Sequence, residues 1–294
     1  MKRVVIDESF LSELELLETA LKNNVAGMFG GNCRTKNLGS SCEFADYRDY
    51  MPGDDVTKID WNAYARFDKL YEKLYFDERQ MHTRIYIDTS RSMDYGTDEK
   101  AVAAVKIAAA FAYLSISAMD KVSIYAIRGG SLEEIVVGIV GKDAYLTCVN
   151  RLNELEFDSD SRISEAIIPS SVGRGDGYSI IISDFLTDDN YEGAIDRLAE
   201  QKRDILCVQV LAREELNPQV RGKMHLFDSE SPSKFFRKKI DKDIIDAYKA
   251  ALKYVTDRIS NYCESRGGHY VLVPAYMELP ELFFDKFVNM GVLK

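Results

Sequence analysis

From residue 84 onward, short apolar runs alternate with stretches of helical periodicity. Strands are predicted at 84–88, 121–127, 132–137, 177–183, 204–211, 223–227 and 269–273, and helices at 98–119, 142–155, 162–171, 189–202, 241–265 and 279–290. Continuous apolar strands separated by helices are typical of a parallel sheet that is covered on both faces. We therefore expect an α/β domain over 84–294 with a mostly parallel sheet. The Gly129-Gly130 pair predicts one hairpin in addition.

Residues 1–83 have a different texture. Apolar side chains recur with helical spacing over 8–23 and predict an amphipathic helix. The stretch 27–42 is rich in Gly, Asn and Ser and is interpreted as loop, whereas 43–82 mixes aromatic and charged residues and predicts short strands and turns. We expect a smaller N-terminal helix and β-rich elaboration, which is either a domain of its own or packed on the sheet.

Composition and charge narrow the choice of partners. The 294-residue chain carries a formal net charge of −10, which argues against nucleic-acid phosphates and anionic membrane surfaces as partners, since both attract surplus Lys and Arg. The apolar stretch 101–119 contains Lys106 and several Ser and Ala residues, so we interpret it as a buried core helix and predict no membrane span. The five cysteines are scattered without a Cys-x-x-Cys pair, which favours reduced thiols and a cytoplasmic location.

Candidate chemistry lies where two predicted strands end in aspartate, because ligands of parallel α/β sheets bind at the carboxyl ends of strands. Asp88, Ser90 and Ser92 have a spacing that places one carboxylate and two hydroxyls on one side of an extended chain. Such hard oxygen ligands suit Mg²⁺ or another hard divalent cation. Further oxygens would have to come from Asp184, after a later strand, or from the loop at 158–161.

The same residues have a simpler explanation. Asp, Ser and Thr directly after a strand are also the residues that begin a helix, because their side chains accept hydrogen bonds from its first amides. The residues alone leave a metal centre and a helix cap as alternatives.

A specific motif occurs in the N-terminal part of the chain. It combines Gly-Asp-Asp, Ile-Asp-Trp and Ala-Arg within residues 53–66, after a Glu-Phe pair and an Arg-x-Tyr-x-Pro segment. The pattern continues through Asp88, Ser90, Ser92, Met93, 224–230 and Tyr248. Together these residues closely resemble the signature of the bacterial family called domain of unknown function 58. The resemblance covers nearly the whole chain.

This resemblance implies a fold, a partner and a site. The family is similar to von Willebrand factor A domains, and its members are typically encoded beside MoxR-type AAA+ ATPases, with which they are thought to act as chaperone-like adaptors. Many members carry N-terminal membrane spans that are not evident here, so the chain resembles the soluble short form. In von Willebrand factor A domains a metal-ion-dependent adhesion site uses Asp-x-Ser-x-Ser, a Thr and a further Asp. The corresponding residues are Asp88, Ser90, Ser92, Ser161 and Asp184, with Asp160 as a competing second-loop ligand.

Three functional hypotheses follow. The favoured one is a non-catalytic protein-interaction module that binds Mg²⁺ and acts with a MoxR-type ATPase and its client protein. The second is a metal-dependent phosphoesterase at the same site, for which no general base is evident in the sequence. The third is a metal-free scaffold in which the oxygen-rich cluster merely caps a helix.

The motif at 53–66 has two interpretations of its own, a docking surface or an internal clamp. The favoured one is the clamp, in which three aspartates pair with Arg48 and Arg66 while Trp61 buries its ring. The aspartates are Asp54, Asp55 and Asp60.

Overall fold

The computed structural model describes residues 6–24, 34–78, 80–94, 99–170, 177–187, 190–219, 222–227 and 235–288. The chain forms two units, each with its own internal contacts. The larger unit combines Met1–Phe29 with Met81–Lys294, and the smaller unit spans Gly30–Gln80. The predicted division into 1–83 and 84–294 groups the N-terminal helix with the β-rich segment, whereas here the helix belongs to the larger unit.

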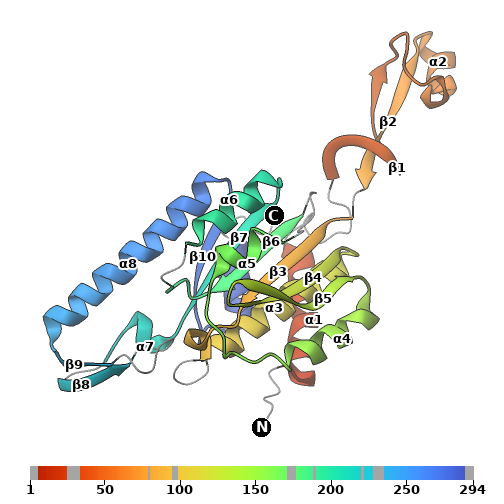
Figure 1. Cartoon of the computed structure of the whole chain (residues 1–294). Coiled ribbons are helices and arrows are strands. Elements are labelled where there is room, and N and C mark those ends of the chain that lie inside the picture. Colours follow the sequence, from red (N-terminus) through yellow and green to blue (C-terminus); the bar gives the residue numbers. More distant parts are fainter. Residues whose placement is uncertain are drawn as a thin grey trace. The chain divides into compact units, whose positions relative to one another are not determined.

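A six-stranded sheet forms the centre of the larger unit (Figure 1). Its strand order is β10-β7-β6-β3-β4-β5, and all neighbouring pairs are parallel except β4 and β5, which form the predicted hairpin. The strands are β3 (His82–Asp88), β4 (Lys121–Arg128), β5 (Ser131–Ile139), β6 (Tyr178–Ser183), β7 (Asp204–Leu211) and β10 (His269–Pro274). The predicted α/β fold with a mostly parallel sheet is confirmed.

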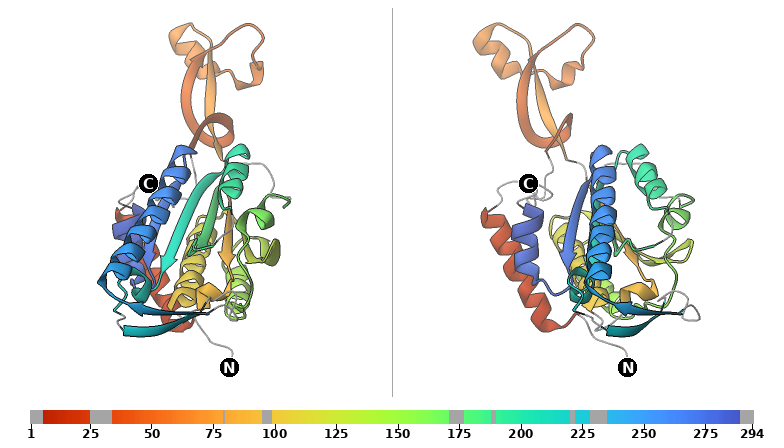
Figure 2. Two further views of the ribbon diagram at one scale, coloured as in Figure 1. Left: turned by 60° about the vertical axis from the view of Figure 1, so that its left-hand side comes forward. Right: turned by 90° about the vertical axis from the view of Figure 1, so that its left-hand side faces the viewer.

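Helices cover both faces of this sheet, and Figure 2 shows α1 (red) and α8 (blue) on opposite sides of it. On one side lies a core shared by α1 (Glu8–Asn24), α3 (Glu99–Ser117), α4 (Lys142–Leu152), α9 (Leu279–Glu281) and the π-helix η3 (Leu282–Val288). On the other lies a core shared by α5 (Ile163–Ile167), α6 (Glu192–Glu200) and α8 (Lys242–Ser265). Strand β3 serves both cores, since Ile85 and Ile87 join the first and Tyr86 joins the second.

Helix α1 joins the larger unit through the apolar face that its sequence predicts. The buried residues on this face are Phe10, Leu14, Leu17 and Leu21. Just before the helix, the Ile6 amide donates to Asn153 Oδ1 at 2.9 Å, and Asn153 Nδ2 donates to the Ile6 carbonyl at 3.0 Å. The helix is therefore part of the α/β core, although the smaller unit separates it from the sheet in sequence.

Helix α3 runs through the main core of the larger unit. By length and composition, its segment Lys100–Ser117 could cross a membrane, and it is the one helix among the described residues with this property. However, 78% of that segment is buried inside the fold. Its apolar side chains belong to the core beneath the sheet, as predicted for a buried helix.

The part of the chain after α4 departs from the prediction in several places. Strand β8 (Gly222–Phe227) pairs antiparallel with β9 (Phe235–Ile240), whose basic run lacks the alternation that predicts a strand. Helix α5 ends at Ile167, before the expected boundary at residue 171. The last predicted helix is divided into α9 and η3. Residues 228–230 of the motif and 289–290 of that helix lie outside the described residues.

The smaller unit is built on a two-stranded ribbon. Strand β1 (Arg34–Asp49) pairs antiparallel with β2 (Tyr71–Glu78), with three register shifts along the ladder. Between the strands lie the 3₁₀-helix η1 (Val56–Lys58) and helix α2 (Trp61–Phe67). The interpretation of 27–42 as loop is wrong from Arg34 onward, because bulges let a strand accommodate the glycine, asparagine and serine residues of this stretch.

The predicted clamp forms in part. Arg48 contacts Asp54 at 3.0 Å, as expected, and also Glu72 at 2.6 Å. Asp60 contacts Lys73 at 3.2 Å instead of an arginine. Its other oxygen caps α2. The hydrogen bond from Tyr47 and those of the cap lower the pKa of Asp60 to about 2, although burial acts against the shift. The aspartates of the motif therefore mainly shape turns and helix ends.

Aromatic side chains of α2 face solvent. Trp61, Tyr64 and Phe67 are 61%, 40% and 65% exposed, and the rings of Trp61 and Tyr64 meet edge to face at 6.3 Å. The prediction that Trp61 buries its ring is wrong, because this seven-residue helix buries only Ala63 and offers no core for an indole. An exposed aromatic face is the property that the docking-surface interpretation requires.

Fluorescence reports this exposure directly, because Trp61 is the single tryptophan of the chain. We expect the native protein to emit close to the maximum of free tryptophan in water. Acrylamide should quench the emission nearly as strongly before as after unfolding in guanidinium chloride. The Trp61→Phe variant supplies the blank. A blue-shifted, weakly quenched emission would show that the ring is covered.

Candidate metal centre

The two predicted aspartates, Asp88 and Asp184, lie at the ends of the neighbouring strands β3 and β6, from which the chain extends the sheet to opposite edges. Strand β4 follows β3 on one side, and β7 and β10 follow β6 on the other, so the neighbours β3 and β6 flank a topological switch point. Ile87 pairs with Ile182, which places Asp88 beside Ser183 and next to Asp184. The carboxyl ends of two adjacent strands thus bring the two acidic side chains together.

Asp88 is the centre of a buried hydrogen-bonded cluster and is 0% exposed. Its Oδ1 accepts the Ser90 amide at 2.9 Å, and its Oδ2 accepts the hydroxyls of Ser161 at 2.7 Å and Ser183 at 2.6 Å. Burial, followed by the nearby Asp184 carboxylate, raises the pKa of Asp88, although these hydrogen bonds act against the shift. A cation at this position would stabilise the charged form of Asp88.

The two serines of the motif lie next to each other. Ser90 Oγ and Ser92 Oγ are 3.0 Å apart, in the turn that follows β3. The arginine between them is engaged elsewhere, since Arg91 Nε donates to the Asp158 carbonyl at 3.0 Å. The motif therefore supplies two adjacent hydroxyl oxygens in the turn that directly follows Asp88.

Ser161, and not Asp160, contacts Asp88 from the second loop. A parallel bridge between Ser90 and Ser159 holds this loop against the turn after β3. The Ser161 side chain is 3% exposed and points to Asp88, whereas the Asp160 side chain is exposed. Of the two alternatives that the sequence leaves open, the geometry favours Ser161.

A buried lysine that the sequence pattern did not single out lies in the same cluster. Lys100, in the first turn of α3, is 1% exposed, and its Nζ contacts Asp184 Oδ2 at 2.9 Å and Glu215 Oε1 at 2.7 Å. Burial alone would lower the pKa of Lys100, but the two carboxylates raise it above its usual value. The only signal in the sequence was a lysine in the first turn of a mostly apolar helix.

Two backbone amides of the loop after β6 hold the side chains of Asp184 and Ser183. Asp184 Oδ1 accepts the Leu186 amide at 3.0 Å, and Ser183 Oγ accepts the Phe185 amide at 2.9 Å. Phe185 adopts a left-handed φ of 52°, which is rare for a bulky residue. Its buried ring packs against Tyr191 with centroids 5.8 Å apart, and this contact helps to hold the turn. The sequence did not indicate the role of Ser183, which ends an apolar strand.

The donor set fits a hard divalent cation. Two buried carboxylates and three hydroxyls supply oxygen atoms only, which is the chemistry that Mg²⁺ prefers. Within the described ranges, no group of three or more His, Cys, Asp or Glu residues could hold a metal ion. A cation here would therefore rely on serine oxygens and on ligands from outside the chain. The residues that would hold it are Asp88, Ser90, Ser92, Ser161 and Asp184.

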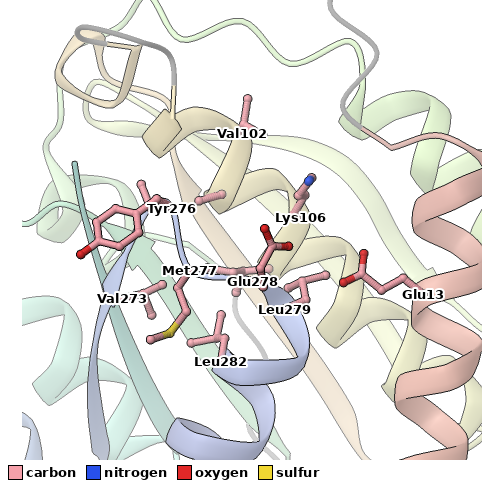
Figure 3. Close-up of a pocket in the computed structure, with 12 residues that line it drawn as sticks. Glu13, Val102, Lys106, Val273, Tyr276, Met277, Glu278, Leu279 and Leu282 are labelled. Atoms are coloured by element: carbon pink, nitrogen blue, oxygen red, sulfur yellow. The ribbon is translucent and has the colours of Figure 1, made fainter. Parts of the chain in front are cut away.

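A separate pocket of about 160 Å³ lies beside α3 (Figure 3). Val102 and Lys106 line it from α3, Glu13 from α1, and Tyr276 and Glu278 from the segment after β10. Its volume is below the roughly 300–1,000 Å³ of typical small-molecule sites. We therefore infer no small-molecule site there, and Asp88 remains the centre of the candidate site.

Two mycobacterial proteins resemble the chain at 26% identity over 231 residues, covering 76% of this chain and 72% of each relative. They are the uncharacterized proteins Rv1480 of Mycobacterium tuberculosis and Mb1516 of Mycobacterium bovis. Among solved structures, the VWA domain of SpRpn10 is similar with a TM-score of 0.38 at 12% identity, covering 71% of this chain and 95% of that chain. The pilus adhesin SpaC from Lactobacillus rhamnosus GG, in its open conformation, gives a TM-score of 0.34 at 11% identity, covering 63% of this chain and 30% of that chain. The family model described as a protein of unknown function, DUF58, matches residues 46–256, and the chain therefore belongs to the DUF58 family.

Proposed function

We propose that the chain is a non-catalytic adaptor whose centre at Asp88 binds Mg²⁺ together with a carboxylate of a partner protein. The observation that supports this most strongly is the fully buried Asp88, on which hydrogen bonds converge from the turn after β3, the second loop and the end of β6. Bound there, the cation would supply positive charge that a partner's Glu or Asp can neutralise. The five candidate ligand side chains would leave at least one position of an octahedral Mg²⁺ shell for such a carboxylate.

The proposed partner is a MoxR-type AAA+ ATPase with its client protein, in chaperone-like assembly in the cytoplasm. This choice rests on the family resemblance, and the site chemistry is consistent with it because an adhesion centre asks only for an exposed acidic side chain on the partner. The net charge of −10 makes nucleic acid a poor partner.

A metal-dependent phosphoesterase at the same centre has less support from the geometry. Hydrolysis would require a general base or an activated water near the ion. His82 and His269 begin β3 and β10, whereas the centre lies at the carboxyl ends of the strands. Sustained phosphoester turnover that disappears in Asp88→Ala would favour the enzyme over the adaptor.

Capture of the ATPase by the immobilised chain tests the adaptor. We expect capture in millimolar Mg²⁺ and its loss in EDTA. Ser161→Ala should weaken Mg²⁺-dependent capture by roughly 10- to 100-fold, because it removes a hydroxyl that touches Asp88. Asp160→Asn is the matched control, since it changes the neighbouring exposed side chain and should leave capture unchanged. Capture that persists in EDTA would contradict an ion-bridged interface.

A further inference from the structure

Lys100 places a positive charge inside the centre that is proposed to bind a cation. Its ammonium lies 2.9 Å from Oδ2 of Asp184, one of the candidate ligands, and both side chains are almost completely buried. Exposed ion pairs are screened by water and salt, but buried charges a few ångströms apart interact strongly. A cation entering the centre would therefore meet the field of Lys100.

We propose that Lys100 is a positioning residue that holds down the affinity of the centre for a divalent cation when no partner is bound. The inference rests on the proposed metal centre and adds a regulation of that same site. Asp88 and Asp184 offer two negative charges, and the Lys100 ammonium neutralises one of them. The ion then binds firmly only when a further negative charge, such as a partner's carboxylate, enters the site.

The contacts of Asp184 support this role. One carboxylate oxygen accepts a hydrogen bond from the Lys100 ammonium, and the other accepts a hydrogen bond from the Leu186 amide. Asp184 is thus held in one orientation, and a cation must compete with the ammonium for the oxygen that faces Lys100. The ammonium both orients the ligand and reduces its effective charge.

Glu215 opposes the effect of Lys100. It lies on α7 (Arg213–Leu216), and its Oε1 contacts Lys100 Nζ at 2.7 Å while its Oε2 accepts the Ala212 amide at 2.8 Å. Because the Glu215 carboxylate also contacts the ammonium, it offsets part of the positive charge that Lys100 presents to the centre. Removing Glu215 should therefore weaken cation binding, whereas removing Lys100 should strengthen it.

Calorimetric titration of the full chain with Mn²⁺, used as the probe ion, tests this opposition. We expect Lys100→Met to bind Mn²⁺ roughly tenfold tighter or more, because the competing charge is removed. Glu215→Gln should bind more weakly than the wild type. Glu214→Gln, which changes the exposed neighbour on α7, is the matched control and should be unchanged.

The double variant Lys100→Met/Glu215→Gln guards against misfolding, because it removes a positive and a negative charge together. It should also bind Mn²⁺ more tightly than the wild type. If the wild type binds Mn²⁺ and both Lys100 variants bind it no more tightly than the wild type, the proposed role of Lys100 is overturned, but the metal centre is not. No binding by the wild type or by any Lys100 variant would overturn the metal centre itself.

Discussion

Asp88→Asn is expected to abolish stabilisation by divalent cations. Wild-type protein with Mg²⁺ at about 100 times its dissociation constant should gain about 2.7 kcal/mol of unfolding free energy over the protein in EDTA. For a unit of this size the melting temperature should then rise by roughly 5–10 °C. The Asp88→Asn variant should show no rise, because the amide keeps the shape of the carboxylate but loses the charge that holds the ion.

In EDTA the same variant is expected to be at least as stable as the wild type. The introduced asparagine can accept the Ser90 amide through its oxygen and donate to the Ser161 and Ser183 hydroxyls through its nitrogen, since hydroxyl groups both donate and accept. The substitution also removes the cost of burying a charged carboxylate and its repulsion by Asp184, which together raise the pKa of Asp88. The Asp88 carboxylate would thus destabilise the protein without an ion, but it would supply the charge that binds the ion.

Differential scanning fluorimetry with EDTA, Mg²⁺, Mn²⁺ and Ca²⁺ measures both effects. Asp158→Asn is the control, because it removes a carboxylate from the same loop whose side chain is 61% exposed and pairs with Arg128. This control should keep the wild-type response to the ions. An identical rise in wild type and Asp88→Asn would place the bound ion elsewhere on the chain.

Gly177→Ala is expected to destabilise the larger unit by about 3 kcal/mol or more. Gly177 has a φ of +132°, and a Cβ there would lie 2.5 Å from the His82 carbonyl oxygen and 2.7 Å from the His82 nitrogen. Two costs add up at this position: backbone strain of about 1–3 kcal/mol and a steric clash (overpacking) of similar size. His82 begins β3 and Gly177 precedes β6, so the clash would separate the two strands that carry the candidate centre.

Urea denaturation of Gly177→Ala and Gly267→Ala separates the clash from the strain. Gly267 also has a positive φ, of +76°, but a Cβ added to it would meet nothing within 4 Å. Gly267→Ala should therefore cost only about 1 kcal/mol. Equal losses in the two variants would mean that β3 and the start of β6 do not approach as closely as described.

The strands of the larger unit were predictable because they are buried on both faces. Such strands are mostly apolar runs, as in 178–183 and 204–211. They can be recognised in the sequence without knowing which strands they pair with. The ribbon β1–β2 was harder, because its register shifts destroy the alternation that predicts a strand. Helix α2 has seven residues, too few for a periodic pattern to emerge.

The candidate centre shows a similar division. Asp88 and Asp184 follow directly from the rule that ligands bind at strand ends. Ser161 and Asp160 differ by one position, and only the path of the loop decides which one reaches Asp88. The contacts of Lys100 span 84 residues to Asp184 and 115 residues to Glu215, and no local pattern encodes pairs so distant in sequence.

The position of α1 in the core has a consequence for synthesis on the ribosome. The apolar face of α1 emerges before its partner α3, which ends at Ser117, after the whole of the smaller unit. At about 5–20 residues per second, the nascent face waits on the order of 10 s before its partner is made. During that interval Phe10, Leu14 and Leu17 form an uncovered stripe. We therefore expect the nascent chain to bind chaperones that recognise exposed apolar segments, until α3 has been made.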